Sequence, residues 1–404
     1  MYLCEQNRSF IDMNKILNYI EELGEGKYQC YKTRKLSLDI SDSDILDYDD
    51  KPVIQIHNSN FAESDMSRVK TVQIPQRLIK LCDSPLFSYF LDGSRHVYKV
   101  DDIAIGNKIY PVLVGQIIVG CCYRKDRDSF KKYKLDRKIV LCLPKPFKDG
   151  TNAKEDDLCR DYCEKINAYI QQNAFIRNSS IRIDSILLYP VDGDDRFNKD
   201  KNAFKDSGTA KIQSEMIRLE QDMVNLLCHE HCLDDAHYLI KDGSLEYRDF
   251  YGVDMKSTEA AILKTNYKHV VGVSKMFNPD LILDFERKKI SKTIAGLKPY
   301  ERTKVYRYKQ GSFEFAIWYL RLRNSDFRET NFSDVVKCEM MLTQPGDVIE
   351  TDNINIICAN LIREAYPTCY GNDERWGNHL YPVFLTEQFC KSNYINQEIL
   401  LNLF

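Results

Sequence analysis

Phe90-Leu91-Asp92-Gly93-Ser94 and Ile240-Lys241-Asp242-Gly243-Ser244 are matching stretches of the chain, and in each an expected strand leads into Asp-Gly-Ser. Each stretch predicts a strand that ends at an aspartate. At such an end the carboxylate projects where the backbone turns away, which leaves room for a cation and a phosphate. Asp-Gly is also a common turn dipeptide, and two others occur at Asp149-Gly150 and Asp192-Gly193. Either stretch alone is therefore most simply a turn, whereas the duplication and the shared serine favour a site.

A third carboxylate is predicted between these two strands. The stretch 214–221 begins an amphipathic helix that leads to the second strand, and a glutamate on it can face both aspartates. Glu220 is our choice and Glu215 the alternative; either is otherwise a solvated helix residue. Three converging carboxylates repel one another, and hard oxygen ligands suit Mg²⁺ or Mn²⁺. Two such ions can activate water and stabilise the departing oxygen in phosphodiester cleavage.

The remaining pattern alternates strands with helices, which predicts an α/β fold. Helices are expected at 10–24, 153–172, 211–230, 256–265 and 353–365, and strands at 86–91, 109–122, 139–143, 181–190, 238–240, 270–273, 312–322 and 334–342. We expect residues 1–80 to form a helical or irregular extension, with an acidic loop at 39–50, and residues 81–404 to form the main domain. The polar stretch 192–207 predicts a mobile insertion.

Composition excludes several classes of protein. The net charge is −3, so any nucleic-acid binding must use local basic surface. No apolar run is long enough to span a membrane and no signal peptide is evident, so a cytoplasmic protein is expected. The 14 cysteines are scattered, which favours reduced thiols. The stretch 228–232, Cys-His-Glu-His-Cys, does not favour zinc, because on a helix its cysteines share one face while its histidines point elsewhere.

Two basic segments are candidates for contact with nucleic acid. Residues 123–138 carry a net charge of +5, and residues 286–309 contain nine basic side chains. Tyr133, Tyr300, Tyr306 and Tyr308 interleave them and offer surfaces for stacking unpaired bases. A merely solvated face is an equally good interpretation of either segment taken alone.

From Phe87 to the C-terminus the order of short motifs resembles the NurA family of nucleases. The resemblance rests on Leu91-Asp92-Gly93-Ser94, the helix bearing Arg218 and Glu220, Asp242-Gly243-Ser244-Leu245, and 271–275, Val-Gly-Val-Ser-Lys. The later segments Trp318-Tyr319-Leu320-Arg321-Leu322 and 381–387, Tyr-Pro-Val-Phe-Leu-Thr-Glu, complete it. It implies an RNase H-like mixed sheet flanked by helices, with elaborations. It also implies a homodimer through which DNA threads, manganese-supported nuclease activity, and a HerA-type hexameric ATPase partner in DNA end processing or antiphage defence.

The resemblance also assigns roles to residues. It gives the metal-ligand role to Asp92, Glu220 and Asp242 and an active-site role to Tyr381. Lys275 becomes a candidate for contacting phosphate or orienting a carboxylate. The chain departs from the family at Gln388-Phe389, where Ala-His is usual, so the late histidine is absent. His379 or Glu387 is a candidate substitute, although His379 alone is more simply a structural or surface histidine.

Two alternatives remain open at this point. If neither substitute acts, the chain is expected to be a non-catalytic DNA-binding or assembly subunit of a HerA-type motor. A nuclease acting on RNA is the other alternative, because the same carboxylates serve both substrates and only contacts to the 2′-hydroxyl distinguish them.

Overall fold

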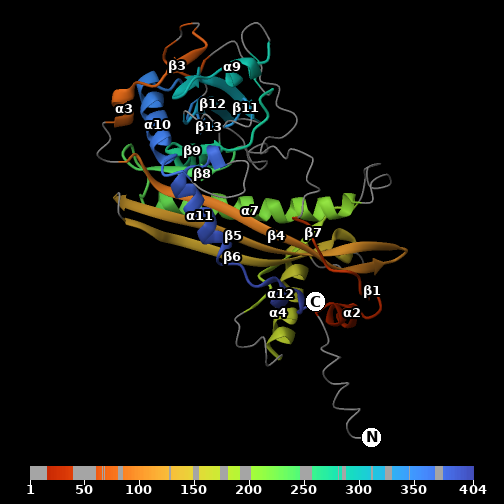
Figure 1. The fold of residues 1–404 in the computed structure, drawn as a ribbon. Helices are drawn as coiled ribbons and strands as arrows, with labels where there is room; N and C mark the ends of the chain where they lie inside the picture. The colour runs from red at the N-terminus through yellow and green to blue at the C-terminus, as the bar shows by residue number, and fades with distance from the viewer. Residues whose placement is uncertain are drawn as a thin grey trace, which may run out of the picture.

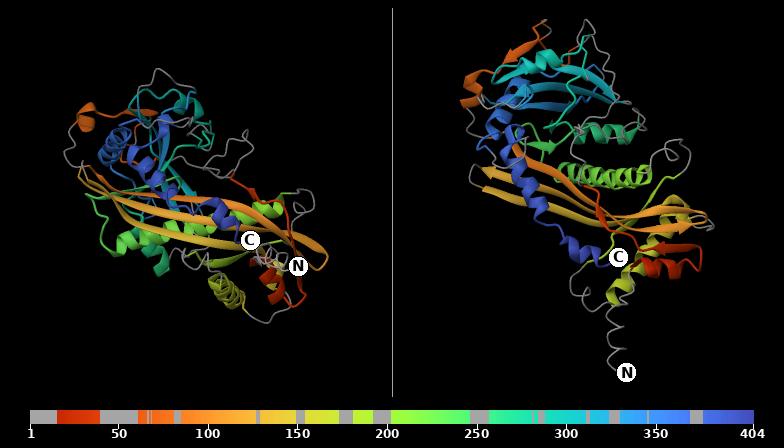
Figure 2. Two further views of the ribbon diagram at one scale, coloured as in Figure 1. Left: turned by 60° about the horizontal axis from the view of Figure 1, so that its bottom comes forward. Right: turned by 45° about the vertical axis from the view of Figure 1, so that its right-hand side comes forward.

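A computed structural model shows the arrangement of the chain (Figures 1 and 2). It describes residues 16–39, 61–65, 67, 69–80, 85–126, 129–148, 154–172, 181–191, 202–245, 257–280, 282–283, 288–310, 313–323, 330–344, 346–368 and 376–404. The Asp-Gly dipeptides at 149 and 192, most of the acidic stretch 39–50 and residues 192–201 lie outside these ranges.

Three long antiparallel strands form the centre of the sheet. They are β4 (Phe87–Ile105), β5 (Lys108–Asp126) and β6 (Ser129–Pro144), and β4 pairs with β5 along almost its whole length. The predicted strand end at Asp92 is therefore wrong, because Asp92 pairs with Gly120 and the strand continues to Ile105. The ladder of backbone hydrogen bonds to β5 outweighs the local turn preference of Asp-Gly. The turn instead falls at Gly106, whose φ is +60°.

The sheet is mixed, and its strands run in the order β3-β10-β12-β13-β9-β8-β4-β5-β6-β7. β4 and β8 are parallel, β8 and β9 are parallel, and β9 and β13 are antiparallel. The remaining strand bounds are β1 (Tyr28–Tyr31), β2 (Leu36–Ser37), β3 (Thr71–Gln73), β7 (Ser185–Tyr189), β8 (Tyr238–Asp242), β9 (Val270–Ser274), β10 (Glu301–Thr303), β11 (Tyr306–Gln310), β12 (Phe313–Arg321) and β13 (Val335–Met341). Each strand predicted from the sequence is present, whereas β1, β2, β3, β10 and β11 were not predicted.

Each predicted helix is present over the described residues and α7 begins earlier than predicted, whereas α3, α9 and α12 were not predicted. Their bounds are α2 (Ile16–Leu23), α3 (Gln76–Lys80), α4 (Glu155–Gln172), α7 (Ala203–His229), α8 (Thr258–Asn266), α9 (Ser291–Ala295), α10 (Thr351–Glu364), α11 (Tyr381–Lys391) and α12 (Gln397–Leu401), with short 3₁₀ helices η1 (Lys145–Lys148) and η3 (Trp376–Asn378). Residues 203–207, predicted to belong to a mobile insertion, form the first turns of α7 instead. β1 and β2 pair with β4, and β3 pairs with β10, so the first 80 residues contribute strands to the same sheet.

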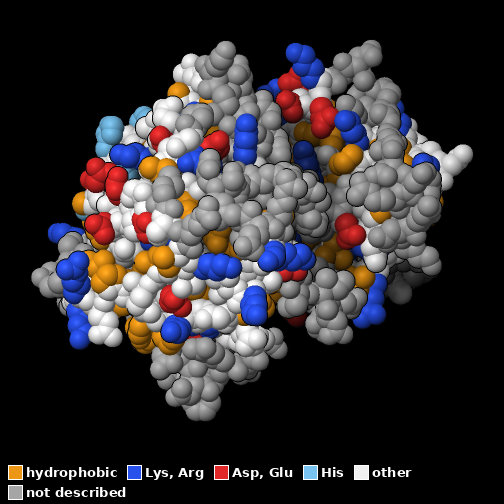
Figure 3. Space-filling model, turned by 90° about the horizontal axis from the view of Figure 1, so that it is seen from above, with side chains coloured by type: hydrophobic (Ala, Val, Ile, Leu, Met, Phe, Trp, Pro, Cys, Tyr) orange, Lys and Arg blue, Asp and Glu red, His pale blue; other side chains and the backbone are white. Residues whose placement is uncertain are grey.

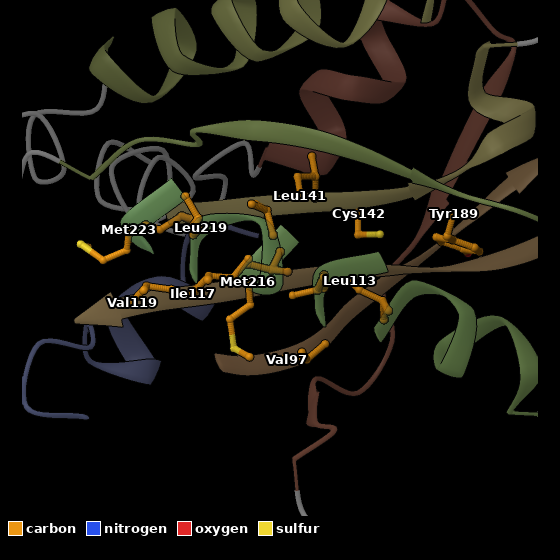
Figure 4. Packing of buried hydrophobic residues seen from close by; sticks show 14 of the residues in the cluster. Val97, Leu113, Ile117, Val119, Leu141, Cys142, Tyr189, Met216, Leu219 and Met223 are labelled. Atoms are coloured by element: carbon orange, nitrogen blue, oxygen red, sulfur yellow. The ribbon is translucent and has the colours of Figure 1, made fainter. Parts of the chain in front are cut away.

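Helices pack on both faces of the sheet. On one face α7 lies along the long strands, and its Met216, Leu219 and Met223 pack with residues of β4 and β5 such as Val97 and Ile117 (Figure 4). On the other face α10 and α11 cover a second hydrophobic cluster that includes Phe90 and Ile240 (Figure 1). Because neighbouring residues of a strand point to opposite faces, Phe90 and Leu91 lie in different clusters.

The two faces come together beside Asp92. β4 pairs with β8 only from Phe87 to Leu91, and β8 ends at Asp242. On the same edge of β4, the next strand pairing among the described residues begins at Tyr98, with β2. The intervening edge of β4 therefore carries no strand of the described chain, and side chains from α7 and α11 can approach one another there.

Two further features bear on the class of protein. None of the helices in the described ranges has the length and the apolar character needed to cross a membrane. Every cysteine in those same ranges is a free thiol.

Candidate active site

Four acidic residues from four elements surround this unpaired edge. Asp92 follows the last residue of β4 that pairs with β8, and Asp242 is the last residue of β8. Glu220 comes from α7 on one face of the sheet, and Glu387 from α11 on the other. The parallel pairing of β4 with β8 explains why two aspartates 150 residues apart reach the same place, because Leu91 pairs with Lys241 and an aspartate follows each.

Gly93 allows Glu220 to reach this edge. A Cβ atom built on Gly93 would overlap Oε1 of Glu220, so the carboxylate lies directly against the strand backbone. Glu220 is 2% exposed. The alternative ligand, Glu215, is engaged elsewhere, because Lys138 and Arg218 donate to it at 2.7 and 2.8 Å. Glu220, rather than Glu215, is therefore the helix carboxylate at the cluster.

Two buried lysines hold the carboxylates. Nζ of Lys275, just after β9, lies 2.9 Å from Oδ2 of Asp242 and 3.4 Å from Oε2 of Glu387. Nζ of Lys241 lies 3.2 Å from Oε2 of Glu220. Burial alone would lower the pKa of Lys275, but the carboxylates of Asp242, Glu387 and Asp92 outweigh burial and raise that pKa. Lys275 is thus a permanently charged partner of the cluster.

Asp92 is the least compensated of the four acids. Burial raises the pKa of Asp92 well above its ordinary value, and the charges of Asp242, Glu387 and Glu220 raise it further, while Lys275 opposes them. Its Oδ2 is buried and has no hydrogen-bond partner among the described residues. A buried carboxylate oxygen without a hydrogen-bond partner lowers stability, so Oδ2 of Asp92 is available to bind a cation.

The pKa of Glu387 is shifted in the opposite direction from that of Asp92. Burial would raise the pKa of Glu387, but Lys275, Lys391 and His379 together lower it to about 2. His379 is buried and interacts electrostatically with Glu387, so both candidate substitutes for the missing histidine lie at the cluster. Tyr381 is partly buried in the first turn of α11. Glu387 lies six positions further along the helix, roughly 240° around its axis, so the two side chains leave α11 on different sides.

A divalent cation fits the donor set and the charge of this group. Four carboxyls and two protonated lysines carry a net charge of −2 when all are ionised, which one divalent ion would balance. Carboxylate oxygens are the ligands that Mg²⁺ and Mn²⁺ prefer, and Asp92 offers one without a partner. No three His, Cys, Asp or Glu side chains of the described residues already form a metal-ligand cage, and the two lysines occupy the carboxylate oxygens instead.

Residues that the sequence analysis missed position the cluster. Lys241 was quoted only as part of a motif, although it pairs with Glu220. Glu339 on β13 is 1% exposed, and its Oε2 accepts hydrogen bonds from Leu245 N–H and Ser244 Oγ at 2.8 Å each, which fixes the turn after Asp242. Asn378 Nδ2 donates to the carbonyl of Lys275 at 2.8 Å. The only signal in the sequence that could have pointed to Glu339 is the alternation of β13, where polar Lys337 and Glu339 interrupt an otherwise apolar run.

The two basic segments differ in exposure. In the described part of the β5–β6 hairpin, the exposed cations are Lys125, Lys131, Lys132, Lys134 and Arg137. In the second segment Arg302 and Lys304 are fully buried against Glu63, and Tyr306 and Tyr308 are buried too. The expectation that these tyrosines offer stacking surfaces is wrong, because they pack in the core beside β12. Viewed from above, acidic and basic side chains are interspersed on the described surface (Figure 3).

The fold and the site define a mixed α/β protein with a buried cluster of carboxylates and lysines at the edge of a central strand. A scan of known family models gives no match to the chain, and a search of the curated proteins gives none either.

Proposed function

We propose that this chain is a metal-dependent nuclease with an RNase H-like fold that hydrolyses DNA phosphodiester bonds with Mn²⁺ or Mg²⁺. The observation that carries the proposal is the convergence of Asp92, Glu220, Asp242 and Glu387 beside one unpaired strand edge. The mixed sheet, in which three antiparallel strands adjoin two parallel ones, also supports it.

Each residue of the cluster then has a task. Asp92, Glu220 and Asp242 would hold the metal, and Glu387 would take the place of the histidine that the NurA-like pattern lacks. Bound divalent ions would supply the activation of water and the stabilisation of the departing oxygen. Lys275 would keep Asp242 and Glu387 oriented, and its compact ammonium is the candidate in the cluster for contacting a phosphate.

The proposed setting follows from the resemblance to NurA nucleases. We expect a cytoplasmic homodimer that acts on DNA ends with a HerA-type ATPase, in DNA end processing or antiphage defence. The exposed cations of the β5–β6 hairpin are the surface that best suits the DNA backbone, because contacts with phosphates require accessible Lys and Arg.

Digestion of linear DNA with Mn²⁺ tests the proposal. Asp92→Ala should abolish cutting, while Asp222→Asn, an exposed acid on the same helix as Glu220, should leave the rate unchanged. Single-stranded RNA of the same sequence serves as a second substrate. Equal cutting by the Asp92→Ala variant and the unchanged protein would refute the assignment of the site.

A second function is favoured by one observation. Both lysines already pair with carboxylates of the cluster, as they would in a purely structural network. The chain would then be a non-catalytic DNA-binding or assembly subunit of a HerA-type motor. Absence of cutting by the unchanged protein, with Mn²⁺ and with the motor added, would favour this function over the nuclease.

A further inference from the structure

Lys241 is placed unlike an ordinary surface lysine. It lies one residue before Asp242 in β8, it is 6% exposed, and its Nζ is 3.2 Å from Oε2 of Glu220. The same Nζ donates to the carbonyl oxygen of Ser244 at 3.2 Å. The ammonium therefore lies between Glu220, a proposed metal ligand, and the turn that follows Asp242, which is also a proposed ligand.

The turn itself is shaped around this ammonium. Gly243 has a φ of +86°, and a Cβ atom on it would lie 3.2 Å from Nζ of Lys241. A residue with a side chain would be strained in this conformation and would crowd the lysine. The backbone after Asp242 thus accommodates a cation that is part of the chain.

We propose that Lys241 is an internal cation that takes the place of the divalent ion at Glu220 in the metal-free protein. The inference rests on the proposed metal site. Without metal, the ammonium neutralises a carboxylate that is fully buried and would otherwise be repelled by Asp242. When a divalent ion binds, it competes with Lys241 for Glu220, so the lysine weakens metal binding while it keeps the ligand in place. Lys241 is in this sense a positioning residue.

The chain offers a matched control, a lysine whose acidic partner lies on the same helix as Glu220. Lys138 pairs with Glu215 of α7 at 2.7 Å, but this pair is more exposed and lies away from the cluster. Removal of the Lys138 charge should change only this partly buried ion pair, in which Arg218 remains to pair with Glu215. Any effect on Mn²⁺ that appears in a Lys241 variant and not in Lys138→Met therefore belongs to the cluster.

Mn²⁺ binding, followed by the paramagnetic resonance signal of the free ion, tests the proposal without reference to activity. Lys241→Met should bind Mn²⁺ more tightly than the unchanged protein by on the order of tenfold, about 1.4 kcal/mol. It should also unfold at a lower temperature in chelator and regain most of the loss when Mn²⁺ is added. If Lys241→Met does not fold, Lys241→Gln removes the charge and keeps a donor for Ser244.

The outcomes separate this inference from the proposed function. Cutting by the unchanged protein with the same Mn²⁺ affinity in the Lys241 and Lys138 variants overturns the inference and leaves the nuclease standing. Tighter Mn²⁺ binding in the Lys241 variants without any cutting supports the inference and refutes the nuclease. No Mn²⁺ binding by any variant overturns both.

Discussion

Nζ of Lys275 lies 2.9 Å from Oδ2 of Asp242, and this pair links the end of β8 to the residue that follows β9. The two strands are parallel neighbours, so the side chains that follow them emerge at one edge of the sheet. Lys275 also reaches Glu387 of α11, which crosses the long strands on the opposite side from α7 (Figures 1 and 2). One ammonium thus joins two strands and a helix that are remote in sequence.

Removal of this ammonium should destabilise the protein strongly. Lys275→Met leaves Asp242 and Glu387 without their shared buried partner, which typically costs about 3–5 kcal/mol. Lys391→Met is the matched control, because Lys391 pairs with the same Glu387 at 2.6 Å but is 48% exposed, and exposed pairs contribute roughly 0–1 kcal/mol. Urea unfolding measures both variants. Similar losses in the two would contradict the importance given to burial.

Asp92→Asn should stabilise the metal-free protein, and the gain should depend on pH. The pKa of Asp92 is raised in the folded state, mainly by burial, so ionisation favours the unfolded chain at pH values above the ordinary aspartate pKa of about 3.9. The penalty grows as the pH rises toward the folded pKa and disappears in acid, where both states are protonated. Asparagine at position 92 cannot ionise and therefore avoids this penalty.

Thermal unfolding in chelator at several pH values between about 4 and 8 measures this difference. The melting temperature of Asp92→Asn should exceed that of the unchanged protein by a margin that widens with pH. A margin that stays constant across the series would show that Asp92 does not carry the raised pKa. Such a gain in stability from loss of a site residue is a common trade-off.

Gly93→Ala should disturb the cluster through Glu220. The new Cβ would overlap Oε1 of Glu220, and insertion of a methyl group into a packed site costs about 1–3 kcal/mol. The cycle of Gly93→Ala, Glu220→Ala and the double variant measures the coupling by urea unfolding. Since the shorter side chain removes the overlap, the alanine at 93 should cost less in the double variant. Additive losses would exclude a direct contact.

Glu339→Ala should loosen the turn after Asp242. It removes the acceptor for Ser244 Oγ and Leu245 N–H, and it breaks the buried ion pair in which Nζ of Lys337 lies 2.7 Å from Oε1 of Glu339. We expect a loss of about 3–5 kcal/mol in unfolding free energy. Glu339→Gln keeps one oxygen acceptor and should lose less. If both variants cost the same, the hydrogen bonds to the turn contribute nothing measurable.

Much of the site could be named from the sequence because its residues follow local rules. The motifs around Asp92 and Asp242 stood out as a pair, and Glu220 stood out on an amphipathic helix that leads to the second strand. Hydrophobic periodicity predicted most strands and helices for the same reason, since it reports which face of an element is buried. The short strands β10 and β11 escaped it, because buried charged residues interrupt the apolar pattern: Arg302 in β10 and Lys304 just after it are compensated by Glu63 far away in the chain.

The sequence by itself determined the α/β pattern and singled out the acidic residues Asp92, Glu220 and Asp242. Only the tertiary structure decided that Asp92 lies inside a long strand, that Glu220 rather than Glu215 joins it, and that Lys241 and Lys275 neutralise the group. Strand pairing and charge compensation join residues more than a hundred positions apart, and their energies depend on burial and distance. Those quantities exist only once the chain has folded, so no local pattern could supply them.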